Sequence, residues 1–193
     1  MPLDVMGYSI PAGHRLRLAV SPTYWPWAWP SPEPVTLTLH GGRVELQERR
    51  PRAEYAELPE FGEPECSAEL ALESEAGSPQ GRSLRRDLAT GLVEQVFDWD
   101  LGGSQRLVDI DLDTSDASHT VYAVHEGDPL SAEVRFRATS GMGRGDWSMR
   151  SEVTSGMTSE LEAFRVTTML EVYEGNARIF ARTWTHRFPR DGV

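Results

Sequence analysis

Lysine is absent from this chain of 193 residues, so all 19 of its basic side chains are arginines. A chain without lysine cannot form a Schiff base, a Walker-type phosphate loop or a Ser–Lys dyad, which excludes the enzyme classes built on them. The 30 acidic residues outnumber the basic ones and give a formal net charge of −11. This balance argues against nucleic acid or an anionic membrane surface as the main partner.

Cysteine is nearly absent as well. Cys66 is the one cysteine in the sequence, so an internal disulfide is impossible. The N-terminus has neither the basic nor the apolar region of a signal peptide, and nowhere do ~18 apolar residues run together as a membrane span requires. We therefore expect a cytoplasmic protein with no membrane partner, and no motif in the sequence indicates a cofactor.

The composition is typical of a turn-rich β protein. It contains 13 prolines, 17 glycines and 39% hydrophobic residues, and its length suits one domain or two small ones. We predict an all-β, antiparallel fold in three regions: a partial β-region at 1–50, a linker or wrapping segment at 51–81, and an antiparallel sheet at 82–193. A short helix within Glu57 to Glu75 is a weaker alternative for part of the linker.

Alternation of polar and apolar residues predicts the strands. In the N-terminal region they are Leu3 to Ile10, Arg15 to Val20, Val35 to His40 and Arg43 to Gln47, the last two joined by a Gly41-Gly42 turn. In the C-terminal region they are Ser83 to Leu88, Gly91 to Phe97, Gln105 to Ile110, Ser118 to His125, Ala132 to Ala138, Asp146 to Val153, Leu161 to Tyr173 and Arg178 to Phe188. Gly175-Asn176 is typical of a tight hairpin turn.

A loop of unusual composition, Ser21 to Pro34, separates two of the N-terminal strands. It holds five prolines, which cannot continue a sheet ladder, and the aromatic residues Tyr24, Trp25, Trp27 and Trp29. Exposure of three tryptophans to water is costly, so we expect this chain or another surface to cover them. Three roles remain open: packing against a neighbouring domain, lining an apolar pocket, or stacking on a sugar.

No catalytic or metal-binding motif is apparent. A G-x-S-x-G elbow is missing, so a serine triad within the chain is not expected. Asp109, Asp111 and Asp113 alternate like calcium ligands, but the required glycine and glutamate are replaced, and we predict one solvated strand face. Asp98 and Asp100 beside Trp99 predict a polar strand end rather than a glycosidase pair. The histidines lack the spacing of a zinc site.

The sequence resembles the C-terminal β-domain of acyl hydrolases of the cocaine esterase and X-Pro dipeptidyl-peptidase (CocE/NonD) group. The resemblance is carried by GHRLRLAVSPTYWPWAWPSPEPVTLTL (13–39) with GGRVELQ (41–47), and by DPLSAEVRF (128–136), GDWSMRSEVTSGMTSELEAFRV (145–166) and ARTWTHRFPRD (181–191). Those hydrolases have an α/β-hydrolase domain with a Ser-Asp-His triad, a helical cap and a C-terminal jelly roll that resembles galactose-binding folds.

The resemblance implies a β-sandwich, with the first ~50 residues as half of a jelly roll and the remainder as a further antiparallel sheet. The nucleophile, acid and base of that group lie upstream of the matching segments, so no catalytic residue carries over. Tyr24, Trp25, Trp27 and Trp29 are implied to face the hydrolase domain or its substrate entrance. We expect a non-catalytic accessory domain of a serine hydrolase (acyl esterase or peptidase) that supports the hydrolase domain and its substrate pocket.

The expected partner is an α/β-hydrolase domain, in cis or in trans, or a second copy of the chain. Because a half jelly roll has an unpaired edge, we predict that the strands of Leu3 to Gln47 complete their sheet against the strands after Arg82, or by dimerising. The alternative function is a stand-alone β-sandwich module that binds a hydrophobic small molecule or glycan through the aromatic loop and the face carrying Trp147 and Trp184.

Overall fold

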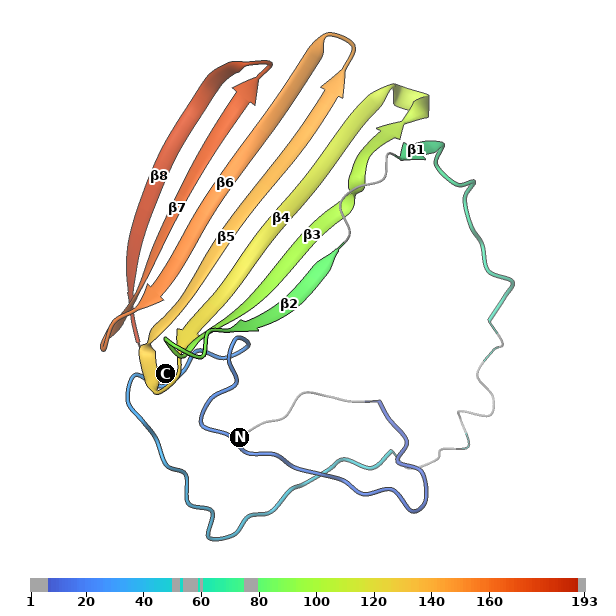
Figure 1. The fold of residues 1–193 in the computed structure, drawn as a ribbon. Coiled ribbons are helices and arrows are strands. Elements are labelled where there is room, and N and C mark those ends of the chain that lie inside the picture. The colour runs from blue at the N-terminus through green and yellow to red at the C-terminus, as the bar shows by residue number, and fades with distance from the viewer. Residues whose placement is uncertain (1–6, 50–52, 54–58, 60, 75–79, 191–193) are drawn as a thin grey trace.

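The computed structural model describes residues 7–49, 53, 59, 61–74 and 80–190. Regular secondary structure in these residues is almost entirely β, and every strand pairing is antiparallel. The predicted all-β, antiparallel class is therefore confirmed. The strands form one twisted sheet in the order β1-β3-β4-β5-β6-β7-β8, with β2 also paired to β3 (Figure 1).

Six consecutive strands form a meander that makes up most of the sheet. They are β3 (Leu92–Leu107), β4 (Leu112–His125), β5 (Asp128–Arg144), β6 (Trp147–Ser159), β7 (Ala163–Glu174) and β8 (Ala177–Pro189). Tight turns join most of them, and Gly175-Asn176 connects β7 to β8 as predicted, with Gly175 at φ 53°. Sequence-adjacent strands lie side by side because closing such short loops costs little entropy.

β8 forms one edge of the sheet, and two short strands form the other edge. β1 (Leu72–Ser74) pairs with the end of β3, and β2 (Gly81–Arg86) pairs with its beginning. The register of β3 with β4 shifts between Asp100 and Ser104, so the strand continues through a bulge where two strands were predicted. Asp98, Trp99 and Asp100 therefore lie within β3 and do not end it.

One face of the sheet, the apolar face, carries most of the large hydrophobic side chains. Residues directly opposite one another in the register share a face, and alternate residues along a strand return to it. Two rows across β3 to β8 illustrate its composition: Phe97, Thr120, Phe136, Ser155, Thr168 and Trp184, and then Trp99, Ser118, Ala138, Val153, Leu170 and Arg182. In β7 the side chains of the apolar face, every second residue from Phe164 to Val172, are half-buried. The side chains at 165, 167 and 169, on the opposite face, are exposed.

The opposite face, the polar face, is crossed by ion pairs. Arg135 contacts Glu94 at 2.7 Å and Glu133 at 2.8 Å, while Arg178 contacts Glu171 at 2.6 Å. Beside the Arg135 group lies a small cluster of the buried residues Val96, Val121 and Ala123, with Leu92 packed against it. Water-exposed pairs of this kind contribute little each, so the small buried cluster is the packed part of this face.

The chain buries little of its surface. Its accessible area is 16071 Å², whereas a compact folded chain of 21.6 kDa would expose about 9,200 Å². Among the described residues, Val96, Val121, Ala123, Ala132 and Ala163 are the buried hydrophobic side chains. The described residues therefore bury no large side chain fully on either face of the sheet.

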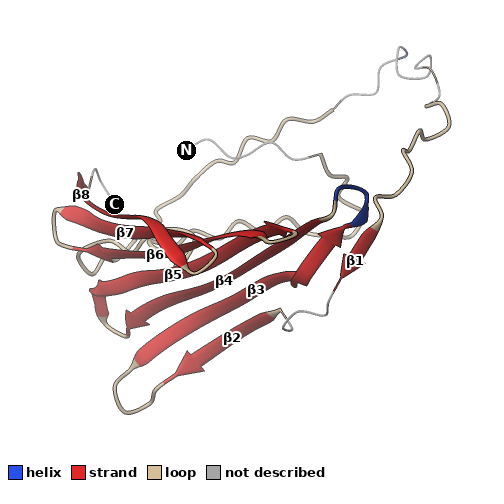
Figure 2. Cartoon of the chain, turned by 90° about the horizontal axis from the view of Figure 1, so that it is seen from above, coloured by secondary structure: helices blue, strands red, loops and turns tan. Residues whose placement is uncertain are grey.

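The N-terminal tract, residues 7–49, does not join the sheet (Figures 1 and 2). The described parts of the predicted strands Leu3 to Ile10, Arg15 to Val20, Val35 to His40 and Arg43 to Gln47 are irregular; residues 3–6 lie outside the described residues. The prediction that they complete a sheet against the strands after Arg82 is wrong for the described chain, and its alternative, completion by dimerising, stays a prediction. Alternation specifies which side chains share a face, but a strand also needs a partner backbone, and within the described chain no strand of the sheet pairs with the tract.

Two local predictions are also corrected. The described residues between Glu57 and Glu75 contain no helix, and their last three form β1. Asp109, Asp111 and Asp113 do not share a strand face, because the 3-10 helix η2 (Val108–Ile110) and the left-handed Asp111, at φ 51°, turn the chain between β3 and β4. Arg106 pairs with both Asp111 and Asp113, which accounts for the carboxylates at this corner.

Candidate functional site

The loop of prolines and aromatic residues folds back on itself. The backbone N–H of Ala28 donates to the Tyr24 carbonyl at 2.8 Å, which forms an isolated bridge, and the Trp25–Pro26 peptide bond is cis. The Ser21 hydroxyl closes a small turn with the backbone of Thr23 at the start of the loop. This closed turn presents the aromatic residues to two sides, so some side chains point to the sheet and others to solvent.

Trp25 and Trp29 anchor the loop to the apolar face. Their rings meet edge to face, with centroids 4.9 Å apart. Trp25 also contacts Tyr122 of β4 with centroids 6.0 Å apart, and Trp29 contacts Phe164 of β7 at 5.3 Å. Such edge-to-face pairs align the ring quadrupoles favourably, beyond the effect of burial alone. The loop therefore covers the end of the apolar face nearest the start of β7.

Arg190, just after β8, holds the loop from the other side. Its guanidinium lies 4.7 Å from the Phe164 ring centroid and donates to the Pro30 carbonyl at 2.5 Å and to the Glu160 carbonyl at 3.2 Å. Burial lowers the pKa of Arg190 from its ordinary value. This charge-assisted hydrogen bond holds the backbone of the loop at Pro30. Pro30 itself is buried.

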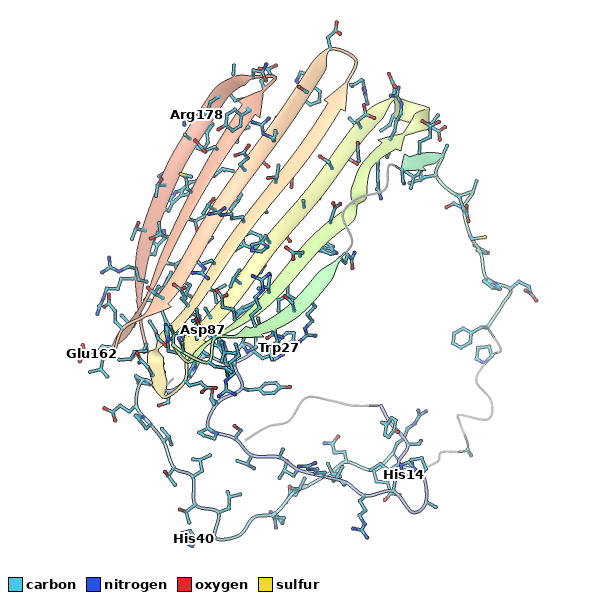
Figure 3. The ribbon with its side chains drawn as sticks, viewed as in Figure 1. His14, Trp27, His40, Asp87, Glu162 and Arg178 are labelled. Carbon is cyan, nitrogen blue, oxygen red and sulfur yellow. The ribbon has the colours of Figure 1, made fainter. Side chains whose placement is uncertain are left out.

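Tyr24 and Trp27 point outward from the anchored loop. Their exposed fractions are 69% and 75%, and Trp27 lies beside the lower end of the sheet in Figure 3. The four aromatic residues of the loop thus divide into two pairs, one packed against this chain's own sheet and one exposed. Exposed aromatic side chains held on a pre-organised loop are typical of contact surfaces.

Trp147 and Trp184 lie on the apolar face but away from the loop. Trp147 begins β6 at the opposite end of the sheet and is 42% exposed. Trp184 lies on the edge strand β8, opposite Thr168, with the Arg182 guanidinium 5.1 Å from its ring centroid. The structure therefore does not bring the six aromatic candidates together into one pocket.

Several titratable side chains of the described residues lie in pairs. His119 Nδ1 lies 2.5 Å from an Asp98 carboxylate oxygen on the polar face, and both side chains are about half exposed. Within the described part of the chain, no group of three or more His, Cys, Asp or Glu is arranged to hold a metal ion. No helix in that part has the length and apolar character that crossing a bilayer requires.

Tyr122, Phe164 and Arg190 are contact residues that the sequence did not single out. Tyr122 and Phe164 belong to strands whose alternation marks them as apolar-face residues, but nothing in the pattern pairs them with a loop about 100 residues or more upstream. Arg190 lies just beyond the last predicted strand. Its role depends on a tertiary contact with Pro30, 160 positions away in the sequence.

Comparison with known families gives one match. Residues 2–58 match the X-Pro dipeptidyl-peptidase C-terminal non-catalytic domain. The match supports the resemblance inferred from the Trp/Pro loop, and it ends before the sheet begins. By its description the matched domain is non-catalytic. No curated protein and no solved structure matches the chain.

Proposed function

We propose that this chain is a non-catalytic accessory module of a serine hydrolase, either an acyl esterase or a peptidase, and that it supports the α/β-hydrolase domain and its substrate pocket. The single observation that carries the proposal is the match of residues 2–58 to the non-catalytic C-terminal domain of X-Pro dipeptidyl-peptidases. Residues 24–29, with all four aromatic candidates, lie inside that match.

The exposure of apolar side chains in the N-terminal tract supports the proposal that a partner covers it. Its apolar side chains are exposed, including Leu16 at 54% and Leu18 at 55%, on a segment whose alternation is that of a half-buried strand. Unpaired backbone and exposed leucines become stable when a neighbouring strand or domain covers them. In the proposed assembly the hydrolase supplies that cover, in cis or in trans.

The anchored loop gives the contact a defined geometry. Trp25 and Trp29 fasten it to the sheet, so the outward residues Tyr24 and Trp27 are held in place before any partner arrives. Pre-organisation lowers the entropy lost on binding. We assign Tyr24 and Trp27 to the surface that meets the hydrolase domain near its substrate entrance.

The first experiment is to sequence the source DNA upstream of the Met1 codon. The proposal expects a reading frame that encodes a G-x-S-x-G elbow with a downstream histidine, fused to this chain or adjacent to it. That hydrolase would then be co-expressed with the tagged full chain. Co-purification is expected to fall at least tenfold in the Tyr24→Ala/Trp27→Ala variant and to persist in the control Phe61→Ala, an exposed aromatic residue outside the matched segment.

Labelling with a fluorophosphonate provides the second readout. The chain alone is expected to remain unlabelled, while the hydrolase in the complex is labelled at its serine. Labelling of the isolated chain would contradict the non-catalytic assignment. Failure of the hydrolase and the chain to associate would contradict the accessory role.

A further inference from the structure

We infer that the apolar face of the sheet is a homodimer interface, in which two copies of this chain pack face to face as the two layers of a β-sandwich. Strands β3 to β8 lie outside the matched residues 2–58, so this interface goes beyond the proposed contact with a hydrolase. A sheet that is apolar on one face needs a second layer to cover that face. The described residues supply only the Trp loop, at one end.

The composition of the apolar face is that of an interface core. Aromatic residues and methionines are enriched there, as in Phe136, Met157 and Phe180, and carboxylates are depleted. Of 30 acidic residues in the chain, the register places only Asp116 and Glu174 on this face between β3 and β8. The strongly acidic character of the protein is therefore directed away from the surface that we propose to be buried.

The area of the face is sufficient for a stable dimer. Six strands about 4.8 Å apart, each at least 12 residues long at about 3.4 Å per residue, outline a face of about 1,200 Å². If the end beneath the Trp loop is left out, pairing two copies buries about 2,000 Å² in total, which falls in the range of obligate homodimers. An interface of that size also accounts for part of the excess accessible surface of the single chain.

A two-fold axis makes the two ends of the face complementary. The axis lies in the plane between the two faces, runs across the strands and passes over Ala138 and Val153. Rotation about it brings the open end of one copy, with Trp147 and Met142, toward the loop end of the other, where Trp25 and Trp29 pack on the apolar face. Figure 3 shows Trp27 and Arg178 near opposite ends of the sheet, which marks these two ends. The contact is isologous and closes on itself, so it gives a dimer and not a filament.

The test is the mass of the full chain in solution, measured by light scattering and sedimentation. We expect twice the 21.6 kDa of one chain. Val153→Asp places a charge at the centre of the apolar face and is expected to give monomers, whereas Thr154→Asp, its neighbour on the polar face, is expected to leave the dimer intact. Circular dichroism checks that both variants keep their β-structure.

Chemical cross-linking between two copies tests the same interface without the Val153→Asp variant. In a Cys66→Ser background, Ala138→Cys places a thiol near the proposed axis and Thr139→Cys places one on the polar face. A short bis-maleimide is expected to join two copies through Cys at 138 at least tenfold more efficiently than through Cys at 139. A monomeric chain, equal cross-linking at the two positions, or a dimer unaffected by Val153→Asp would overturn the inference. The proposed hydrolase contact would stand in each case.

Discussion

The tract 7–49 and the sheet from β2 to β8 have the same kind of sequence and different structures. Both alternate polar and apolar residues, yet the sheet pairs along its length while the tract stays irregular. In the sheet, each strand from β3 to β7 is followed by its partner after a short connection. In the tract, a loop of 14 residues rich in proline and tryptophan separates Arg15–Val20 from Val35–His40.

This difference shows that alternation and pairing are separate pieces of information. Alternation sets which side chains can share a buried face, whereas pairing depends on a neighbour whose backbone can be reached at low entropic cost. The meander contains its own neighbours, whereas no strand of the described sheet pairs with the tract. Substitutions of matched chemistry in the two regions should therefore have very different effects on the stability of the chain.

The largest contrast is expected from a charge placed at one alanine in each region. Ala163, at the start of β7, has an exposed fraction of 0%, so Ala163→Glu buries an unpaired carboxylate and should lower the free energy of unfolding by about 4 kcal/mol or more. Ala19 in the tract is exposed, and Ala19→Glu should change it by less than about 0.5 kcal/mol. Urea unfolding followed by circular dichroism measures both.

Equal losses of unfolding free energy in Ala163→Glu and Ala19→Glu would contradict this contrast, because they would mean that the tract is as tightly packed as the sheet. A variant Ala163→Gly provides a further check. It removes the methyl group without adding a charge and should cost far less than Ala163→Glu if the buried carboxylate causes the loss.

An intermediate effect is expected where the two regions touch. Trp29→Ala removes the ring that packs on Phe164 and should cost about 2 kcal/mol of unfolding free energy, whereas Trp27→Ala, at an exposed ring, should cost less than about 0.5 kcal/mol. Limited proteolysis within residues 21–34 should accelerate in Trp29→Ala and stay unchanged in Trp27→Ala.

Trp29→Phe separates ring packing from hydrogen bonding at the same position. Within the described residues the Trp29 indole N–H is buried without a hydrogen-bond partner. Its removal relieves an unsatisfied donor while an aromatic ring remains, so Trp29→Phe should be much less damaging than Trp29→Ala. A loss as large as that of Trp29→Ala would show that the ring contact with Phe164 does not anchor the loop.

The sequence predicted the sheet well where its information is local. Alternation identified the two faces of β8, with Phe180, Arg182, Trp184 and His186 together, and the register confirms this division. Gly175-Asn176 predicted its turn because a two-residue loop requires residues that tolerate positive φ. Strand ends were extended by several residues in the structure, since pairing with long neighbours continues past the point where alternation weakens.

The sequence could not predict the contacts that join the two regions. Trp25 and Trp29 were recognised as rings in need of cover, but their partners Tyr122 and Phe164 look like any other apolar-face residues of the sheet. Arg190 likewise has no local signal for its bond to the Pro30 carbonyl. Such contacts depend on the path of the whole chain, and alternation contains no information about it.

The smallest effect is expected in the pH dependence of the sheet. Glu160, between β6 and β7, accepts hydrogen bonds from Arg165 and Arg187, and these bonds hold the pKa of its carboxyl below the ordinary value. A depressed pKa in the folded state contributes stability at pH values above the ordinary one, and this contribution disappears as the pH falls through the folded-state pKa. Because the carboxyl is solvent-exposed, the contribution should be small.

Glu160→Gln removes the titrating group from this position. Between neutral pH and a pH below the ordinary carboxyl range of about 4, its urea midpoint should fall slightly less than that of the unmodified chain. Glu33→Gln removes the same charge in the tract and serves as the matched control. If the two variants showed the same pH profile, the pairing of Glu160 with Arg165 and Arg187 would have no effect on stability, and the sheet would differ from the tract in its packing but not in its electrostatics.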